Sequence, residues 1–232
     1  MVSALNGWSI RYWVRSKLRI SILCSSAEHP INAHLRQWMD RYGGVHDIEL
    51  VRSKRDLRGG DILFLISCVE VVKEDVTGKY NHTLVVHASD LPVGRGWSPH
   101  IWSIVAGGTE IVVSLLEAAE PVDSGAIWLK VRIDVPVTAL YDEINHLLFG
   151  AELELMDFAV KNAQAIVPSP QDPTVEPTYF ARRTPEDSRV DPHASIASQF
   201  DLIRVCDPNR FPAYFELHGQ RFLLKLEKSD DS

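Results

Sequence analysis

His87 and Asp123 are the two residues whose types and surroundings best fit acid/base chemistry. His87 ends the apolar run TLVVH and precedes a loop rich in Gly and Pro. Asp123 lies in a turn between two apolar runs, with Gly125 close behind it. A carboxylate beside an imidazole fixes its tautomer and favours its protonated form, so the two side chains would exchange protons as a pair. The plainer alternative is a polar strand end and a turn former that bonds its own backbone.

Alternating strands and helices would position this pair. Apolar periodicity predicts a helix that contains Ile31, Leu35 and Met39 and stops at Gly43-Gly44, and further helices over about 99–106 and 137–165. Such alternation indicates an α/β fold with a mostly parallel sheet, whose ligands gather outside the carboxyl ends of the strands. His87 falls at such an end. The predicted strands cover residues 19–24, 47–51, 61–67, 83–89, 110–117 and 126–133.

The chain divides into four predicted parts. Residues 1–18 form an N-terminal extension, 19–166 the main domain and 167–178 a linker. The linker prediction rests on four prolines among residues 167–177, which exclude a helix interior or a central strand. Residues 179–232 form a small α+β annex, with a helix over 193–205 and a hairpin, AYFEL and RFLLKL, joined by HGQ.

Composition excludes several classes of function. The net charge of -7 and the lack of any Lys/Arg run longer than two disfavour a nucleic-acid partner. Three cysteines without metal-ligand spacing predict buried thiols, a reducing compartment and no metal site. No run approaches the roughly 18 to 20 apolar residues of a membrane-spanning helix. We therefore expect a soluble, cytoplasmic protein that does not bind membranes.

The loop after His87 strengthens the case for a site. Gly94 and Gly96 would let the backbone approach a ligand closely, and the flat face of Trp97 could cover one. Together with Asp123, these residues resemble the folate-dependent formyltransferase family. The family shows a strand ending in His, a loop of the form H-x-S-x-L-P with a downstream Arg-Gly, and an apolar strand running into an Asp-Thr/Ser-Gly turn. Here these read HASDLPVGRGWSP and VDSG, and the similarity extends from about residue 61 to 165.

The resemblance implies a Rossmann-like formyltransferase fold, catalysis by His87 and Asp123, and 10-formyltetrahydrofolate as formyl donor. The annex segment YFARRTPEDSRVDP, residues 179–192, is similar to the R-R-T-P-E-D-S segment of formyltransferases that act on nucleotide-linked 4-amino sugars. The loop also resembles members associated with surface-sugar biosynthesis, including formylation of pseudaminic-acid-type precursors. The implied acceptor is a nucleotide-linked amino sugar. Methionyl-tRNA and glycinamide ribonucleotide formyltransferases, the other acceptor classes of the family, stay as alternatives.

The resemblance also implies two sets of binding residues. Backbone groups would hold the pterin of the donor at Ile66, Ser67, Cys68, Val69, Glu117, Ala118, Pro121 and Val122. The acceptor would contact Ser89, Asp90, Gly94, Arg95, Gly96, Trp97, Ser98, Arg182, Arg183 and Arg204, with the last three as candidates for the diphosphate. Alternatively, Trp97 is ordinary core, the Arg-Arg pair belongs to a solvated charge cluster, and the annex makes a homodimer.

One residue departs from the family pattern. The family has Asn-x-His, and strand alternation puts that Asn on the face of the His, where it helps hold the formyl oxygen. This chain has Val85 there. Valine donates no hydrogen bond, so a backbone N–H or the Ser89 hydroxyl would have to replace it. Otherwise the chain is a non-catalytic homologue that binds folate or a nucleotide sugar.

Overall fold

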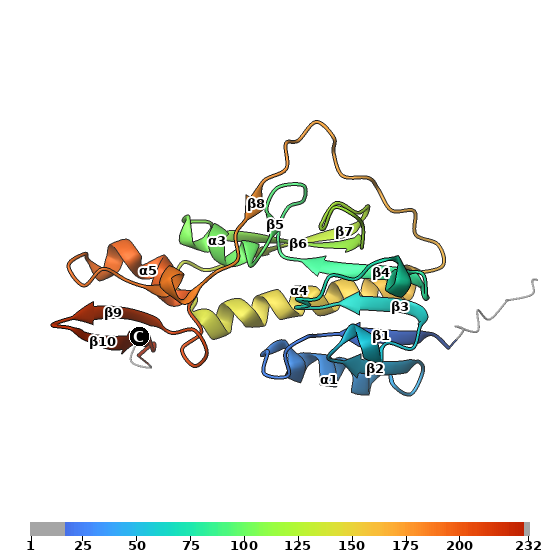
Figure 1. The fold of residues 1–232 in the computed structure, drawn as a ribbon, viewed down its shortest axis with the longest axis horizontal. Helices are drawn as coiled ribbons and strands as arrows, with labels where there is room; N and C mark the ends of the chain where they lie inside the picture. The colour runs from blue at the N-terminus through green and yellow to red at the C-terminus, as the bar shows by residue number, and fades with distance from the viewer. Residues whose placement is uncertain (1–16, 230–232) are drawn as a thin grey trace, which may run out of the picture.

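The computed structural model describes residues 17–229, so the predicted extension over 1–18 lies almost wholly outside the described residues. A six-stranded sheet forms the centre, in the order β2-β1-β3-β4-β6-β7 (Figure 1). The first four strands in the chain run parallel, β6 runs antiparallel to β4, and β7, antiparallel to β6, points the same way as the first four. The sheet is therefore mostly parallel, as predicted. Its strands are β1 (Arg19–Leu23), β2 (Asp47–Val51), β3 (Gly60–Leu65), β4 (Tyr80–His87), β6 (Glu110–Glu117) and β7 (Ile127–Asp134).

All six predicted strands form, with shifted ends. β3 stops at Leu65 rather than at residue 67, because Ser67 adopts a left-handed conformation with φ 47°. β4 begins three residues early at Tyr80, because that residue still pairs with Gly60 of β3. It ends at His87 rather than at residue 89, where the Ser89 N–H turns back to the His87 carbonyl. His87 is thus the last residue of a central strand.

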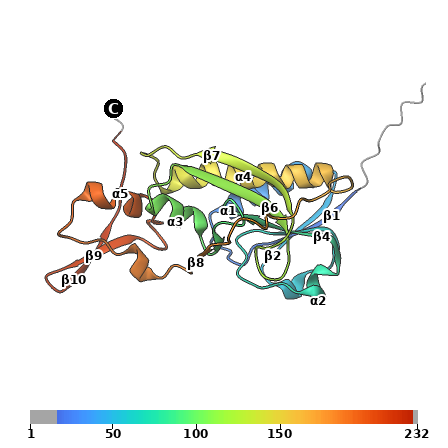
Figure 2. The ribbon, with the colours of Figure 1, turned by 90° about the horizontal axis from the view of Figure 1, so that it is seen from above.

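Helices α1 (Ile31–Tyr42) and α4 (Tyr141–Asn162) pack with one face of the sheet into the larger core. α3 (Pro99–Val105) contributes Ile104 to the same core. α4 is shorter than the predicted 137–165. It begins at Tyr141 because the Leu140 N–H is capped by the Glu143 carboxylate. Figure 2 shows α4 running along the sheet.

The other face carries a smaller cluster, and two short elements there were not predicted. These are the 3₁₀ turn η1 (Lys54–Asp56) and helix α2 (Glu74–Thr77), each too short to show a periodic pattern. None of the described helices is both long and apolar enough to cross a membrane.

Residues 167–178 arch from the end of α4 across the sheet to β8 (Figure 1). There β8 (Tyr179–Phe180) pairs in parallel with β5 (Arg95–Gly96), a two-residue ladder that was not predicted. Beyond it lie η2 (Pro185–Ser188), α5 (Ile196–Arg204) and the hairpin of β9 (Ala213–Leu217) and β10 (Gln220–Leu224). The hairpin turns at His218 and Gly219, both with positive φ, within the predicted turn. α5 is shorter than the predicted 193–205, since the Ser195 side chain caps its start. The annex sits at one end of the molecule.

Candidate active site

The fold brings His87 and Asp123 together. His87 ends β4, and Asp123 lies in the loop that joins β6 to β7. Their side chains face each other with His87 Nδ1 and Asp123 Oδ1 3.8 Å apart. Both residues are buried, 8% and 7% exposed. Attraction between opposite charges is far stronger in such a site than in water, so the pair is positioned for proton exchange.

The other nitrogen of His87 defines where the protons sit. Nε2 lies 2.9 Å from the carbonyl oxygen of Gly94. A carbonyl only accepts hydrogen bonds, so Nε2 carries a proton. Nδ1, which faces the carboxylate, is then the nitrogen that gains or loses one. The ring therefore offers one N–H donor and one exchangeable proton site.

The Asp123 backbone adopts the left-handed conformation, with φ 61°. Asp is among the few residues that tolerate this region. The turn points the carboxylate back to the sheet, where Oδ2 accepts the N–H of Gly96 at 3.0 Å. One carboxylate thus contacts the end of β4 and the loop that follows it.

Val85 lies two residues before His87, on the same face of β4. Its side chain is half-buried and packs in the smaller apolar cluster beside Cys68 and Ala118. These two residues belong to the two loops predicted to hold the pterin. The residue that replaces the family Asn therefore borders the predicted donor site. Among the described residues, the buried Ser89 hydroxyl has no hydrogen-bond partner and is free to act as a donor.

The predicted donor-binding loops flank β4. Residues 66–69 follow β3, and the Ala118 N–H is bonded to the Thr83 carbonyl at 2.8 Å. Val69 and Val122 are 54% and 55% exposed, so each loop presents apolar surface. Apolar walls of this kind suit the flat faces of a ring such as a pterin. The predicted residues of this set are Ile66, Ser67, Cys68, Val69, Glu117, Ala118, Pro121 and Val122.

The predicted acceptor residues divide into two groups. Ser89, Gly94, Gly96, Trp97 and Ser98 lie in the loop beside the pair, and Trp97 is 38% exposed rather than core. Asp90 and Arg95 are engaged with protein groups. Asp90 forms an ion pair with Lys130 at 2.6 Å. The Arg95 guanidinium binds Gln171 and Tyr179.

The three arginines predicted to bind the diphosphate have different surroundings. Arg182 stacks on Trp97, with its guanidinium carbon 4.8 Å from the ring centre, and Arg183 stacks on Trp102 at 5.2 Å. Arg182 thus lies next to the loop after His87, and Arg183 lies against α3, the helix that follows this loop. Arg204 is 2% exposed and binds Asp201 and two backbone carbonyls, so its side chain holds α5 against the main domain and has no free face for a ligand.

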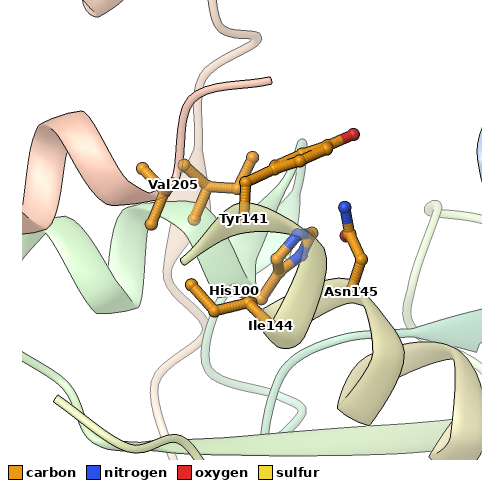
Figure 3. Close-up of a pocket in the computed structure, with 6 residues that line it drawn as sticks. His100, Tyr141, Ile144, Asn145 and Val205 are labelled. Atoms are coloured by element: carbon orange, nitrogen blue, oxygen red, sulfur yellow. The ribbon is translucent and has the colours of Figure 1, made fainter. Parts of the chain in front are cut away.

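Two half-buried histidines, His29 and His100, were not singled out in the sequence. Desolvation lowers the pKa of His100 to about 4, and its electrostatic interactions with His87, His29 and Arg183 add to this effect. Burial likewise lowers the pKa of His29 to about 4. His100 borders a cavity of about 10 Å³, room for no more than one water (Figure 3). Tyr141, Ile144 and Asn145 of α4 project around it (Figure 3). The two rings would be neutral at pH 7, and His100 is the one that interacts electrostatically with His87.

Gln171 was also missed. It lies in the Pro-rich segment, yet its side chain bonds the Asp123 loop. No local pattern marks it. Among residues 17–229, no group of three or more His, Cys, Asp or Glu side chains could hold a metal ion.

No protein-family model matches the chain. Several solved structures match it in fold. The chain superposes on a methionyl-tRNA formyltransferase from Clostridium thermocellum with TM-score 0.77 and 20% identity, covering 93% of this chain and 95% of that one. A sugar N-formyltransferase from a Shewanella species gives TM-score 0.67 and 12% identity, over 91% and 98%.

HypX from Aquifex aeolicus, in complex with tetrahydrofolic acid, gives TM-score 0.75 and 22% identity over 90% of this chain. The match spans 37% of the HypX chain. The three structures together show that the chain has the formyltransferase fold.

Proposed function

We propose that the protein transfers a formyl group from 10-formyltetrahydrofolate to the amine of a nucleotide-linked amino sugar. The observation that carries the proposal is the buried His87–Asp123 pair, with Nδ1 and Oδ1 3.8 Å apart at the end of a central strand of a formyltransferase fold. Residues 19–166 would form the catalytic domain. Residues 179–232 would form the annex that meets the nucleotide.

The donor would lie against the loops at residues 66–69 and 117–122, on the face of β4 that carries Val85 and His87. It supplies the formyl carbon, and its tetrahydrofolate is the leaving group. Exposed Val69 and Val122 support this placement by offering apolar walls on both sides. The tetrahydrofolic acid bound to HypX, a protein of the same fold, is consistent with a folate donor.

The residues of the pair have separate roles in this reaction. The neutral sugar amine attacks the formyl carbon, so a new C–N bond forms while the bond to the folate nitrogen breaks. The N–H of His87 Nε2 stabilises the negative charge that develops on the formyl oxygen. This oxygen takes the place that the Gly94 carbonyl holds on Nε2. Asp123 orients the ring and accepts the proton that the amine loses, and that proton passes to the departing folate nitrogen.

Two arginines of the annex without an ion pair support a phosphorylated acceptor. Arg189, Arg204, Arg210 and Arg221 each form an ion pair with a carboxylate. Arg182 and Arg183 form no ion pair among the described residues; Arg182 stacks on Trp97 of the active-site loop, whereas Arg183 stacks on Trp102 of α3 and donates to the Asp187 carbonyl at 2.8 Å. The buried Nη1 of Arg183 has no hydrogen-bond partner among residues 17–229. Two cations at this place suit a diphosphate, whereas the paired remainder of the annex offers little to an RNA.

A panel assay tests the proposal. Purified protein is incubated with 10-formyltetrahydrofolate and UDP-, dTDP-, GDP- or CDP-linked amino sugars, with glycinamide ribonucleotide and methionyl-tRNA as further acceptors. The mass of each product shows whether a formyl group has been added. Formylation of one sugar that is lost in His87→Ala and Asp123→Asn supports the proposal. Formylation of tRNA or glycinamide ribonucleotide alone would refute the choice of acceptor.

A second candidate function rests on Val85. Without the family Asn, the chain could bind folate or a nucleotide sugar and transfer nothing. Binding of both ligands by calorimetry, together with no product from any acceptor, would favour this second function. The exposed Phe222 and Leu223 of β10, 44% and 60% exposed, keep a homodimer through the annex hairpin as a further prediction, which light scattering would test.

A further inference from the structure

A segment far from the catalytic residues in sequence lies across both of their loops. Residues 169–180, called the strap below, begin at Ser169, whose N–H and carbonyl pair with those of Ile127. They end at β8, where Thr178 and Phe180 accept the N–H groups of Arg95 and Trp97 at 2.9 and 3.1 Å. The strap is therefore anchored beside the loop that carries Asp123 and beside the loop that follows His87.

Gln171 is the strap residue that contacts the catalytic loop. Its Nε2 donates to the carbonyl oxygens of Asp123 at 2.7 Å and of Gly125 at 3.0 Å. Its Oε1 accepts from Arg95 at 2.7 Å. Arg95 is 8% exposed and donates from its other terminal nitrogen to the Tyr179 hydroxyl at 3.2 Å. The Gln171 amide oxygen is thus fixed by the buried Arg95 guanidinium, while the amide nitrogen binds the two loop carbonyls.

The two carbonyls belong to the part of the loop that most needs support. Asp123 has φ 61°, a left-handed conformation that a non-glycine residue keeps only where the surroundings hold it. The direction of the Asp123 side chain follows from this backbone. A carbonyl fixed at Asp123 and another fixed at Gly125 leave the turn little freedom to rotate, so the carboxylate stays aimed at His87.

The Gly94–Gly96 loop is held by the same strap. The Gly94 N–H donates to the Thr178 hydroxyl at 2.8 Å, and the Gly94 carbonyl is the partner of His87 Nε2. A Cβ at Gly96 would lie 2.4 Å from the Phe180 carbonyl oxygen, so this contact requires glycine. The strap therefore sets the position of the groups on both sides of the His87 ring.

We propose that Gln171 is a positioning residue for the catalytic pair: with Arg95 behind it, it holds the Asp123 turn so that the carboxylate meets His87 and Gly96. This inference rests on the proposed function for the catalytic meaning of the pair. The effect of Gln171 on the position of the Asp123 carboxylate can be tested without any substrate.

The substrate-free test measures amide hydrogen exchange by NMR in the full chain. The Gly96 N–H is held by the Asp123 carboxylate, whereas the N–H groups of Arg95 and Trp97 are held by backbone carbonyls. In Gln171→Leu we expect Gly96 to exchange about tenfold faster, with Arg95 and Trp97 within about twofold of wild type. Unchanged Gly96 exchange would overturn the proposal, and so would equal acceleration of all three amides.

Two further variants separate the parts of the contact. Gln171→Glu keeps an acceptor for Arg95 and loses both donations to the loop carbonyls, so it should behave like Gln171→Leu at Gly96. Glu176→Gln changes an exposed strap side chain and serves as the matched control. If Gln171→Glu leaves Gly96 protected as in wild type, the donations to the carbonyls do not position the turn.

The activity test is a double-mutant cycle on the formylated product. Gln171→Leu should lower kcat about tenfold, with KM for the donor within about twofold. In the Asp123→Asn background the same change should have no further effect, because both act through one carboxylate. An equal loss in both backgrounds would mean that Gln171 acts elsewhere. If wild type formylates nothing, the proposed function fails while the exchange result still decides the role of Gln171.

Discussion

Among the places where the described part of the molecule buries ionisable side chains, two differ in what surrounds the charge. At the end of β4, His87 and Asp123 face each other, and each has a second partner from the backbone of the following loop. In the middle of α4, Glu152 is equally buried at 8% exposure, but its Oε2 has no hydrogen-bond partner among the described residues. Desolvation alone raises the pKa of Glu152 to about 8.

The difference teaches that burial does not by itself mark a catalytic group. A lone buried carboxyl neutralises, since the cost of keeping an unpaired charge away from water exceeds the cost of taking up a proton. A paired carboxylate with a backbone donor can keep its charge in an equally buried place. Only the second arrangement places a carboxylate beside an imidazole, as the proposed reaction requires. His100, with its pKa lowered to about 4 by desolvation, resembles Glu152 in favouring its neutral form.

Removal of the His87 imidazole should have the largest effect on kcat. We expect His87→Ala to lower kcat by about 1000-fold, because the donor to the formyl oxygen is lost. The formylated product, quantified by mass, measures it. His193→Ala, an exposed annex histidine, is the control and should keep wild-type activity. A His87→Ala enzyme within tenfold of wild type would show that the pair is not the catalytic centre.

Neutralising the partner should have a smaller effect. Asn at position 123 tolerates the left-handed backbone and can still accept the Gly96 N–H, so Asp123→Asn should fold normally. It loses the charge that accepts the amine proton, and we expect kcat to fall about 100-fold. Asp56→Asn changes an exposed carboxylate and is the control. Activity equal to wild type in Asp123→Asn would place the proton acceptor elsewhere.

At the unpaired site the expected effect is on stability rather than on rate. In the unfolded chain Glu152 loses its proton near its ordinary pKa of 4.5, whereas in the folded protein it keeps the proton up to about pH 8. Glu152 therefore costs stability as the pH rises through this range. We expect Glu152→Gln to raise the free energy of unfolding by about 4 kcal/mol at pH 8 and by little at pH 4.5.

Denaturant unfolding at a series of pH values measures this gain. Glu154→Gln, at an exposed position of the same helix, should show no such trend. A gain from Glu152→Gln that is the same at both pH values would mean that the carboxyl is not held neutral by burial.

The paired site was easier to predict from the sequence than the groups that support it. His87 and Asp123 each stand in a local motif, a strand end and an Asp-Ser-Gly turn. Asp123 follows β6, which runs antiparallel to β4, so the loop after β6 turns back to bring its carboxylate to His87. Gln171 is 48 residues from Asp123 and lies in a segment without periodicity. Its role depends on how a proline-rich chain crosses the sheet, which no local propensity specifies.

The arginines show the same limit. Arg204 and Arg183 have equal chemistry in the sequence, yet Arg204 lies on the inner side of α5 against the carbonyls of Pro136 and Ala139. Arg183 stacks on Trp102 of α3, the helix that follows the active-site loop. Strands and helices could be predicted because their patterns are local, but the packing of the annex against α4 decides which arginine remains available.

The smallest expected effect concerns the residue that departs from the family pattern at the paired site. Val85 shares a face with His87, so Asn there would add an amide donor toward the formyl oxygen. A single such donor is worth about 100 to 1000-fold where it is the main one. We expect only about a tenfold rise in kcat for Val85→Asn, because the free Ser89 hydroxyl already supplies part of this stabilisation. Val85→Leu, which has nearly the shape of Asn without its amide, should show no rise in kcat.

Val86→Asn puts the same amide on the opposite face, in the larger core, and should lower stability without raising kcat. Equal rates for Val85→Asn and Val85→Leu would mean that the oxyanion donor is already complete in the wild-type site.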